Sequence, residues 1–156
     1  MSPTINVLFL VAEAVPFVKI GGLADVAGSL PLALRALPEQ VKGENRLDVR
    51  LVLPLHQSMR AEETTLHLVA EFSVSRGGGY IPAQVYETSV GGMPVYLISG
   101  DPFTSASSVY SADPALDREK YTFFSLAVLE LSRRLDWQVD ILHANDWHTA
   151  LALYAL

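Results

Sequence analysis

The sequence contains no cysteine, and this absence excludes two kinds of stabilisation. A chain without cysteine forms no disulfide framework and binds no structural metal through thiolates. Long apolar runs are also missing, because none reaches the roughly 18 residues that a membrane-spanning helix requires. The first residues, MSPTINVLFLVAEAVP, lack the basic region and the small-residue cleavage site of a secretory signal. We therefore expect a cytoplasmic protein.

Positive charge is scarce, since 11 Lys and Arg residues face 17 Asp and Glu residues and leave a net charge of −6. Nucleic acids and anionic membranes are bound through clusters of Lys and Arg, so we expect neither as a partner. Hydrophobic residues make up 50% of the 156 residues, which is enough for one buried core. Small molecules and neutral polymers are better candidates.

Apolar runs and helical periodicity predict an α/β fold. Strands are expected at residues 5–13, 47–55, 66–75, 81–88 and 94–99, and helices at 22–37 and 116–135; residues 137–156 predict a short strand, a turn and a new helix. The unbroken apolar run at 5–13 is typical of a strand covered on both faces. We therefore predict a Rossmann-like parallel sheet, with residues 66–99 as an appended antiparallel meander.

Three segments carry more local expectations. Pro31 lies inside the first helix, where it should bend or interrupt the helix. Residues 37–46 form a polar connector, and residues 101–114, rich in Ser, Asp and Pro, suit a surface loop. The last helix ends on apolar residues without a stop signal, so we expect an incomplete domain.

The first candidate site, called here the glycine corner, comprises residues 19–25 and follows the first strand. Gly21 and Gly22 allow a ligand to approach the backbone, the helix N-terminus offers free N–H donors, and Lys19 adds a positive charge. This combination suits a phosphate or diphosphate. The pattern is neither the dinucleotide fingerprint nor the P-loop. A simple turn remains the alternative, with Asp25 only favouring the first helical turn.

The second candidate site, called here the histidine turn, is HANDWH at residues 143–148. In one interpretation Asp146 caps the following helix and Trp147 is an ordinary core aromatic. In the other, Asp146 and His148 face a cleft shared with the glycine corner and bind a polyhydroxy substrate. A metal held by His143, Asp146 and His148 is a further alternative, although the spacing matches no familiar site. Two further histidines are expected outside any site: His56 in a loop and His67 on a strand surface.

The two corners together resemble a known enzyme family. AEAVPFVKIGGLADVAGSLPLAL and HANDWHTAL are similar to two sequence blocks of the bacterial glycogen synthases and plant starch synthases. Members of this family are retaining glucosyltransferases of the GT-B type, which transfer glucose from ADP-glucose to an α-1,4-glucan. The resemblance implies two Rossmann-like domains with the active site between them, in the pathway of glycogen or starch biosynthesis, and no metal or other cofactor.

The resemblance also implies roles for particular residues. Lys19 and Asp146 would be catalytic; Lys19, Gly21, Gly22 and Asp25 would bind ADP-glucose; Tyr110, Asp146 and His148 would contact the sugar or the acceptor glucan. Lys19 would neutralise the departing diphosphate in place of a cation. The sequence departs from the family in KGENRLDVR, in the loop YSADPALDREKYTFFS, and at Asn145, where many bacterial members carry His.

The same resemblance implies that residues 1–156 form an incomplete N-terminal domain, and that the C-terminal nucleotide-binding domain is absent. We expect such a chain to be inactive alone. The alternative is a stand-alone glucan-binding or regulatory module without transferase activity. A nucleotide-binding oxidoreductase domain is disfavoured because its glycine pattern differs. The sequence does not distinguish ADP-glucose from UDP-glucose, or glycogen from starch.

Overall fold

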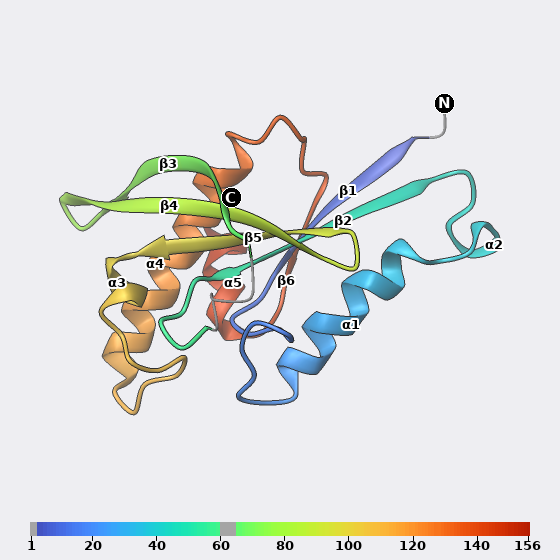
Figure 1. Ribbon diagram of the computed structural model, residues 1–156. Coiled ribbons are helices and arrows are strands. Elements are labelled where there is room, and N and C mark those ends of the chain that lie inside the picture. The colour runs from blue at the N-terminus through green and yellow to red at the C-terminus, as the bar shows by residue number, and fades with distance from the viewer. Residues whose placement is uncertain (1–2, 60–64) are drawn as a thin grey trace.

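The computed structural model describes residues 3–59 and 65–156, which form one sheet with helices on both faces (Figure 1). The strands are β1 (Thr4–Leu10), β2 (Arg46–Pro54), β3 (His67–Arg76), β4 (Gly79–Val90), β5 (Met93–Gly100) and β6 (Ile141–Ala144). The helices are α1 (Leu23–Arg35), α2 (Glu39–Lys42), α3 (Asp101–Thr104), α4 (Pro114–Ser132) and α5 (Trp147–Tyr154). Along the sheet the strand order is β3-β4-β5-β2-β1-β6.

The sheet has a parallel part and an antiparallel part. β1 pairs in parallel with β2 and with β6, and β2 pairs in parallel with β5. β4 pairs in antiparallel fashion with both β3 and β5, which makes β3, β4 and β5 a meander. The predicted α/β class, with a meander appended to a parallel sheet, is confirmed.

β1 lies inside the sheet and contributes to a core on each face. Leu8, Leu10 and Ala12 are buried in the same cluster as Phe103 of α3, Phe124 of α4 and Ala152 of α5. Val7, Phe9 and Val11 are buried in a second cluster with Ala27 of α1. Successive side chains of a strand point to opposite faces, so this alternation places α1 on one face and α3, α4 and α5 on the other. The predicted burial of the first strand on both faces is confirmed.

Several local features differ from the predictions or add to them. Pro31 does not interrupt α1, which continues to Arg35, because packing of α1 on the sheet offsets the lost hydrogen bond. The connector contains the short helix α2, and the expected surface loop begins with α3 and buries Phe103 and Val109. In β3 the pairing slips between Leu68 and Ala70, and Leu68 stays about half exposed.

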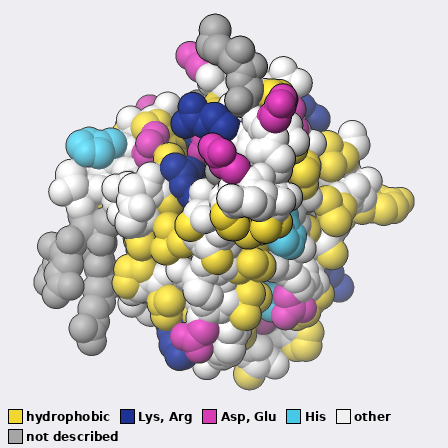
Figure 2. All heavy atoms as spheres, turned by 90° about the vertical axis from the view of Figure 1, so that its right-hand side faces the viewer, with side chains coloured by type: hydrophobic (Ala, Val, Ile, Leu, Met, Phe, Trp, Pro, Cys, Tyr) yellow, Lys and Arg dark blue, Asp and Glu magenta, His cyan; other side chains and the backbone are white. Residues whose placement is uncertain are grey.

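Charges of both signs share the surface shown in Figure 2, where Lys and Arg side chains lie next to Asp and Glu side chains, with apolar side chains between them. Asp48, for example, forms ion pairs with Arg35 and Arg50. Among the helices in the described part of the chain, none is long and apolar enough to cross a membrane.

Candidate active site at the carboxyl ends of the parallel strands

The glycine corner brings Lys19 and Asp25 together. The Lys19 ammonium donates to both carboxylate oxygens of Asp25 at 2.7 Å, and both side chains are about half exposed. Asp25 lies in the first turn of α1, so the ion pair holds the lysine beside the N-terminus of this helix. A positive side chain and the unpaired N–H groups of a first helical turn therefore share one small surface.

The buried side chain of Glu13 binds the backbone of the glycine corner. Glu13 is 2% exposed, and its Oε2 accepts hydrogen bonds from the backbone N–H groups of Ile20 at 2.5 Å and Gly21 at 2.9 Å. Bonds to a carboxylate are stronger than bonds between neutral groups. The chain direction between β1 and α1 is therefore fixed by a buried side chain that the sequence analysis did not single out.

The two glycines of the corner differ in their surroundings. The N–H of Gly21 donates to Glu13, so this amide could bind a ligand only if its bond to Glu13 were broken. Gly22 occupies the N-cap of α1, and a Cβ atom built on it meets nothing within 4 Å. The fold therefore leaves open space above Gly22, at the helix end where an anion is favoured.

In the histidine turn, Asp146 caps a helix with an exposed carboxylate and has an uncommon backbone conformation. Oδ1 accepts from the backbone N–H of Trp147 at 2.6 Å and caps α5, as one interpretation predicted. The backbone of Asp146 has φ of 64°, which is uncommon for a residue other than glycine and costs energy. The carboxylate stays about half exposed. Trp147 is 54% exposed, so its predicted place in the core was wrong.

His148 is buried beside this turn among aromatic rings. Its ring stacks on Tyr110 with centroids 4.7 Å apart, and it meets the edge of Tyr121 at 4.5 Å. Burial lowers the pKa of His148. Within the described chain, Nδ1 of His148 has no hydrogen-bond partner, and it lies 4.0 Å from Oδ2 of Asp146. A buried polar atom without a partner is rare, and it fits a site that binds polar groups.

Tyr110 links the two candidate sites. Its hydroxyl donates to Oε1 of Glu13 at 3.0 Å, while its ring stacks on His148. Burial and the hydrogen bond to the Glu13 carboxylate raise the pKa of Tyr110, which therefore stays protonated as a donor. The glycine corner, Glu13, Tyr110 and the histidine turn thus form one continuous set of contacts, as expected if both corners face the same cleft.

The metal alternative finds no geometric support. Among the described residues, no group of three or more His, Asp and Glu side chains is placed to hold a metal ion. His143 packs against Phe9 in the cluster on the α1 face, whereas His148 packs against Tyr110 and Tyr121 on the other side. The two histidines therefore point to different sides of the sheet.

His56 is more than a loop residue. It is 4% exposed, and its Nε2 hydrogen-bonds the carbonyl of Ala12 at 2.8 Å. Burial lowers its pKa to about 4, so this ring is neutral and Nε2–H is the donor. His56 lies in the loop after β2, as expected, but the sequence did not indicate its burial, because its partner Ala12 lies 44 residues earlier in the chain. His67 is exposed at the start of β3, as expected.

Comparisons with known proteins agree with this arrangement. The family described as the starch synthase catalytic domain matches residues 6–156. A glycogen synthase of Bacillus cereus is 39% identical over 155 residues, and one of Clostridium beijerinckii is 36% identical over 147 residues. These matches cover 97% and 94% of this chain but 30% and 29% of the relatives.

A solved structure resembles the fold closely. The catalytic domain of starch synthase IV from Arabidopsis thaliana, bound to ADP and acarbose, matches with a TM-score of 0.78 and 28% identity. The match covers 97% of this chain and 29% of the plant chain. The chain thus spans about 30% of the length of the relatives it matches. Because the family match extends over nearly all residues, the chain belongs to the starch synthase catalytic domain family, together with the bacterial glycogen synthases.

Proposed function

We propose that this chain forms the N-terminal wall of the active site of a glycogen or starch synthase. The complete enzyme would transfer glucose from ADP-glucose to the non-reducing end of an α-1,4-glucan, with retention of configuration. The observation that carries the proposal is the contact from the glycine corner through Glu13 and Tyr110 to His148. One wall would then serve both the leaving nucleotide and the sugar.

The glycine corner would hold the diphosphate of the donor. Lys19 lies beside the first turn of α1, and the space above Gly22 is open, so a charged group and helix N–H donors converge there. Asp25 would orient the Lys19 ammonium until the diphosphate takes over part of its charge. Lys19 would then stabilise the negative charge that develops on ADP as the glycosidic bond breaks. The Arabidopsis relative, which is bound to ADP, supports this choice of nucleotide.

The histidine turn would hold the sugar or the acceptor glucan. Asp146 presents a half-exposed carboxylate on a strained backbone, and His148 presents a buried Nδ1 without a partner. Sugar hydroxyl groups donate and accept hydrogen bonds, so they suit both groups. Tyr110 would complete this side with its aromatic ring. Asp146 is the residue of this turn that we propose to be catalytic.

We propose that the remaining length of the relatives corresponds to the later part of this domain and a C-terminal nucleotide-binding domain. The present residues would then be inactive alone, and the complete enzyme would be cytoplasmic. The second candidate function, a glucan-binding or regulatory module, would use Tyr110, Asp146 and His148 without the donor corner.

The test is radiolabelled glucose transfer to glycogen by the complete enzyme, with ADP-glucose and UDP-glucose in parallel. We expect transfer from ADP-glucose, and a decrease of about 10²-fold or more in Lys19→Ala, because a charged group that stabilises the transition state is lost. Arg133→Ala is the matched control, since Arg133 is exposed and pairs with Glu130 on α4. A Lys19→Ala enzyme as active as the control would contradict the donor role. Glucan binding without transfer would favour the module.

A further inference from the structure

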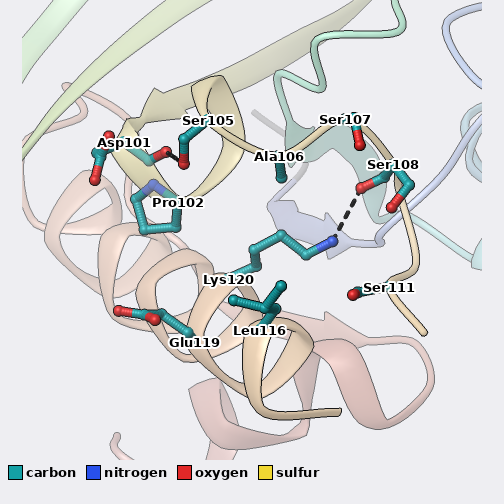
Figure 3. A pocket seen from close by; sticks show the side chains of 10 residues that line it. All are labelled: Asp101, Pro102, Ser105, Ala106, Ser107, Ser108, Ser111, Leu116, Glu119 and Lys120. Carbon is teal, nitrogen blue, oxygen red and sulfur yellow. Dashed lines mark hydrogen bonds between the residues drawn. The ribbon is translucent and has the colours of Figure 1, made fainter. Parts of the chain in front are cut away.

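A buried ion pair on α4 contacts residues 108–111, the segment that contains Tyr110. Lys120 and Asp117, both on α4, have side chains only 3% and 8% exposed, and Lys120 Nζ lies 2.8 Å from Asp117 Oδ1. Nζ also donates to the backbone carbonyl of Ser108 at 3.0 Å (Figure 3). It donates to the backbone carbonyl of Val109 at 2.7 Å as well. The ammonium group therefore has three acceptors, of which two belong to the segment just before Tyr110.

Asp117 holds the other side of Tyr110. Both of its carboxylate oxygens accept from the backbone N–H of Ser111, at 2.9 and 3.0 Å. The Tyr121 hydroxyl adds a bond of 2.7 Å to the carbonyl of Val109. The backbone is thus fixed to α4 immediately before and immediately after Tyr110.

Apolar packing supports this segment at Val109 and Tyr110, but little in the residues before them. Ser105, Ala106, Ser107 and Ser108 line a pocket together with Asp101 and Glu119, as Figure 3 shows. Ser105, Ser107 and Ser108 are exposed, and Val109 is the apolar side chain of residues 105–111 that is fully buried. The ion pair therefore adds polar bonds to the backbone on both sides of Tyr110, beside the contacts that the Tyr110 side chain makes with Glu13, Tyr121 and His148.

A buried ion pair is an expensive way to stabilise a fold, because desolvation of two charges offsets most of their attraction. Apolar side chains of similar volume often stabilise a protein equally well or better. They would provide no donor for the carbonyls of Ser108 and Val109 and no acceptor for the N–H of Ser111. The pair is therefore better explained by the backbone geometry that it imposes than by stability.

We infer that Lys120 and Asp117 are positioning residues that act through Tyr110. They hold its hydroxyl against Glu13 and its ring against His148, and so keep the sugar side of the site in register with the glycine corner. This inference rests on the proposed synthase function. Neither residue belongs to the glycine corner or to the histidine turn.

A double-mutant cycle in the complete enzyme tests the inference. We expect Lys120→Met to lower kcat/KM for glucose transfer by about tenfold when Tyr110 is present, and by less than about twofold in a Tyr110→Ala background. Positioning through Tyr110 predicts this loss of effect. Equal factors in the two backgrounds would show a general structural role and would overturn the inference. Arg118→Met, at an exposed position on the same helix, is the matched control and should leave kcat/KM unchanged in both backgrounds.

Amide hydrogen exchange gives a readout that does not depend on activity. Exchange at Ser111 should become at least about tenfold faster in Lys120→Met and in Asp117→Asn, and should not change in Arg118→Met. Unchanged exchange in both variants would overturn the inference. If Lys120→Met does not fold, Asp117→Asn, which keeps an oxygen acceptor, replaces it in the cycle. If the parent enzyme transfers no glucose, the proposed function is wrong, and exchange alone decides whether the pair holds the segment.

Discussion

Two alanine substitutions, one inside helix α1 and one at its N-cap, should affect the stability of the chain to different extents. A Cβ atom at Gly28 would lie 2.2 Å from Val15 Cγ2 and 2.9 Å from the Val15 carbonyl oxygen, whereas a Cβ atom at Gly22 meets nothing within 4 Å. The Val15 segment cannot easily retreat, since its N–H is bonded to the carbonyl of Ala24 at 3.1 Å. Alanine gains about 1 kcal/mol of helix propensity over glycine, but overpacking of this severity costs more.

We therefore expect Gly28→Ala to lower the free energy of unfolding by about 1–3 kcal/mol. Gly22→Ala should change it by no more than about 0.5 kcal/mol, because Gly22 has φ of −69° in an open position. Urea denaturation of this chain, followed by tryptophan fluorescence, measures both. A Gly28→Ala chain as stable as the parent would refute the packing argument.

The same pair separates fold from ligand binding at the glycine corner. If a diphosphate approaches the backbone at Gly22, a methyl group there should raise KM for ADP-glucose by about tenfold or more in the complete enzyme, since it fills the space that the ligand needs. An unchanged KM in Gly22→Ala would show that the ligand does not approach this residue closely.

Two further predictions concern buried polar groups. Glu13→Gln should lower the free energy of unfolding by about 1–3 kcal/mol, because the hydrogen bonds from two backbone amides and from Tyr110 lose their carboxylate acceptor. Thermal unfolding measures this change, with Glu44→Gln at an exposed position as the control. Equal midpoint temperatures in the two variants would contradict the prediction. Burial lowers the pKa of His56 from 6.5 to about 4, so its contribution to stability is complete above pH 6.5 and is lost as the pH falls toward 4. Between pH 7 and pH 4 the free energy of unfolding of the parent should fall by on the order of 3 kcal/mol more than that of the His56→Gln variant. Urea denaturation at each pH measures both. Equal decreases in the two proteins would rule out this titration.

The fold was predictable from the sequence where a pattern is local. The apolar run ending near Glu13 and the alternation that ends at Val74 follow from burial of one or both faces of a strand. Pro31 was misjudged because intrinsic helix propensity is weaker than the packing of a whole helix on a sheet.

The site was predictable only in part, for a physical reason. Lys19, Asp25 and Asp146 lie in the segments that follow β1 and β6, near the edge of the sheet where ligands of α/β proteins bind, so position alone made them candidates. Glu13 looked like the last residue of an apolar strand, and its hydroxyl partner on Tyr110 lies 97 residues away. Lys120 was not singled out within the helix predicted at residues 116–135. Partners that are distant in sequence leave no periodic signal, so only the folded chain reveals them.

The position of β6 beside β1 has a consequence for how the protein is made. The N–H of Asn6 bonds the Asp140 carboxylate 134 residues later, and Asn145 bonds the carbonyl of Leu10 across 135 residues. A ribosome adds about 5–20 residues per second, so the β1 edge waits on the order of ten seconds for its neighbour. The segment that contains Lys19 is synthesised early, and the segment that contains Asp146 is synthesised late. In a nascent chain β1 can therefore pair with β2 on one edge, but its other edge stays unpaired until β6 and the segment with Asp146 have emerged.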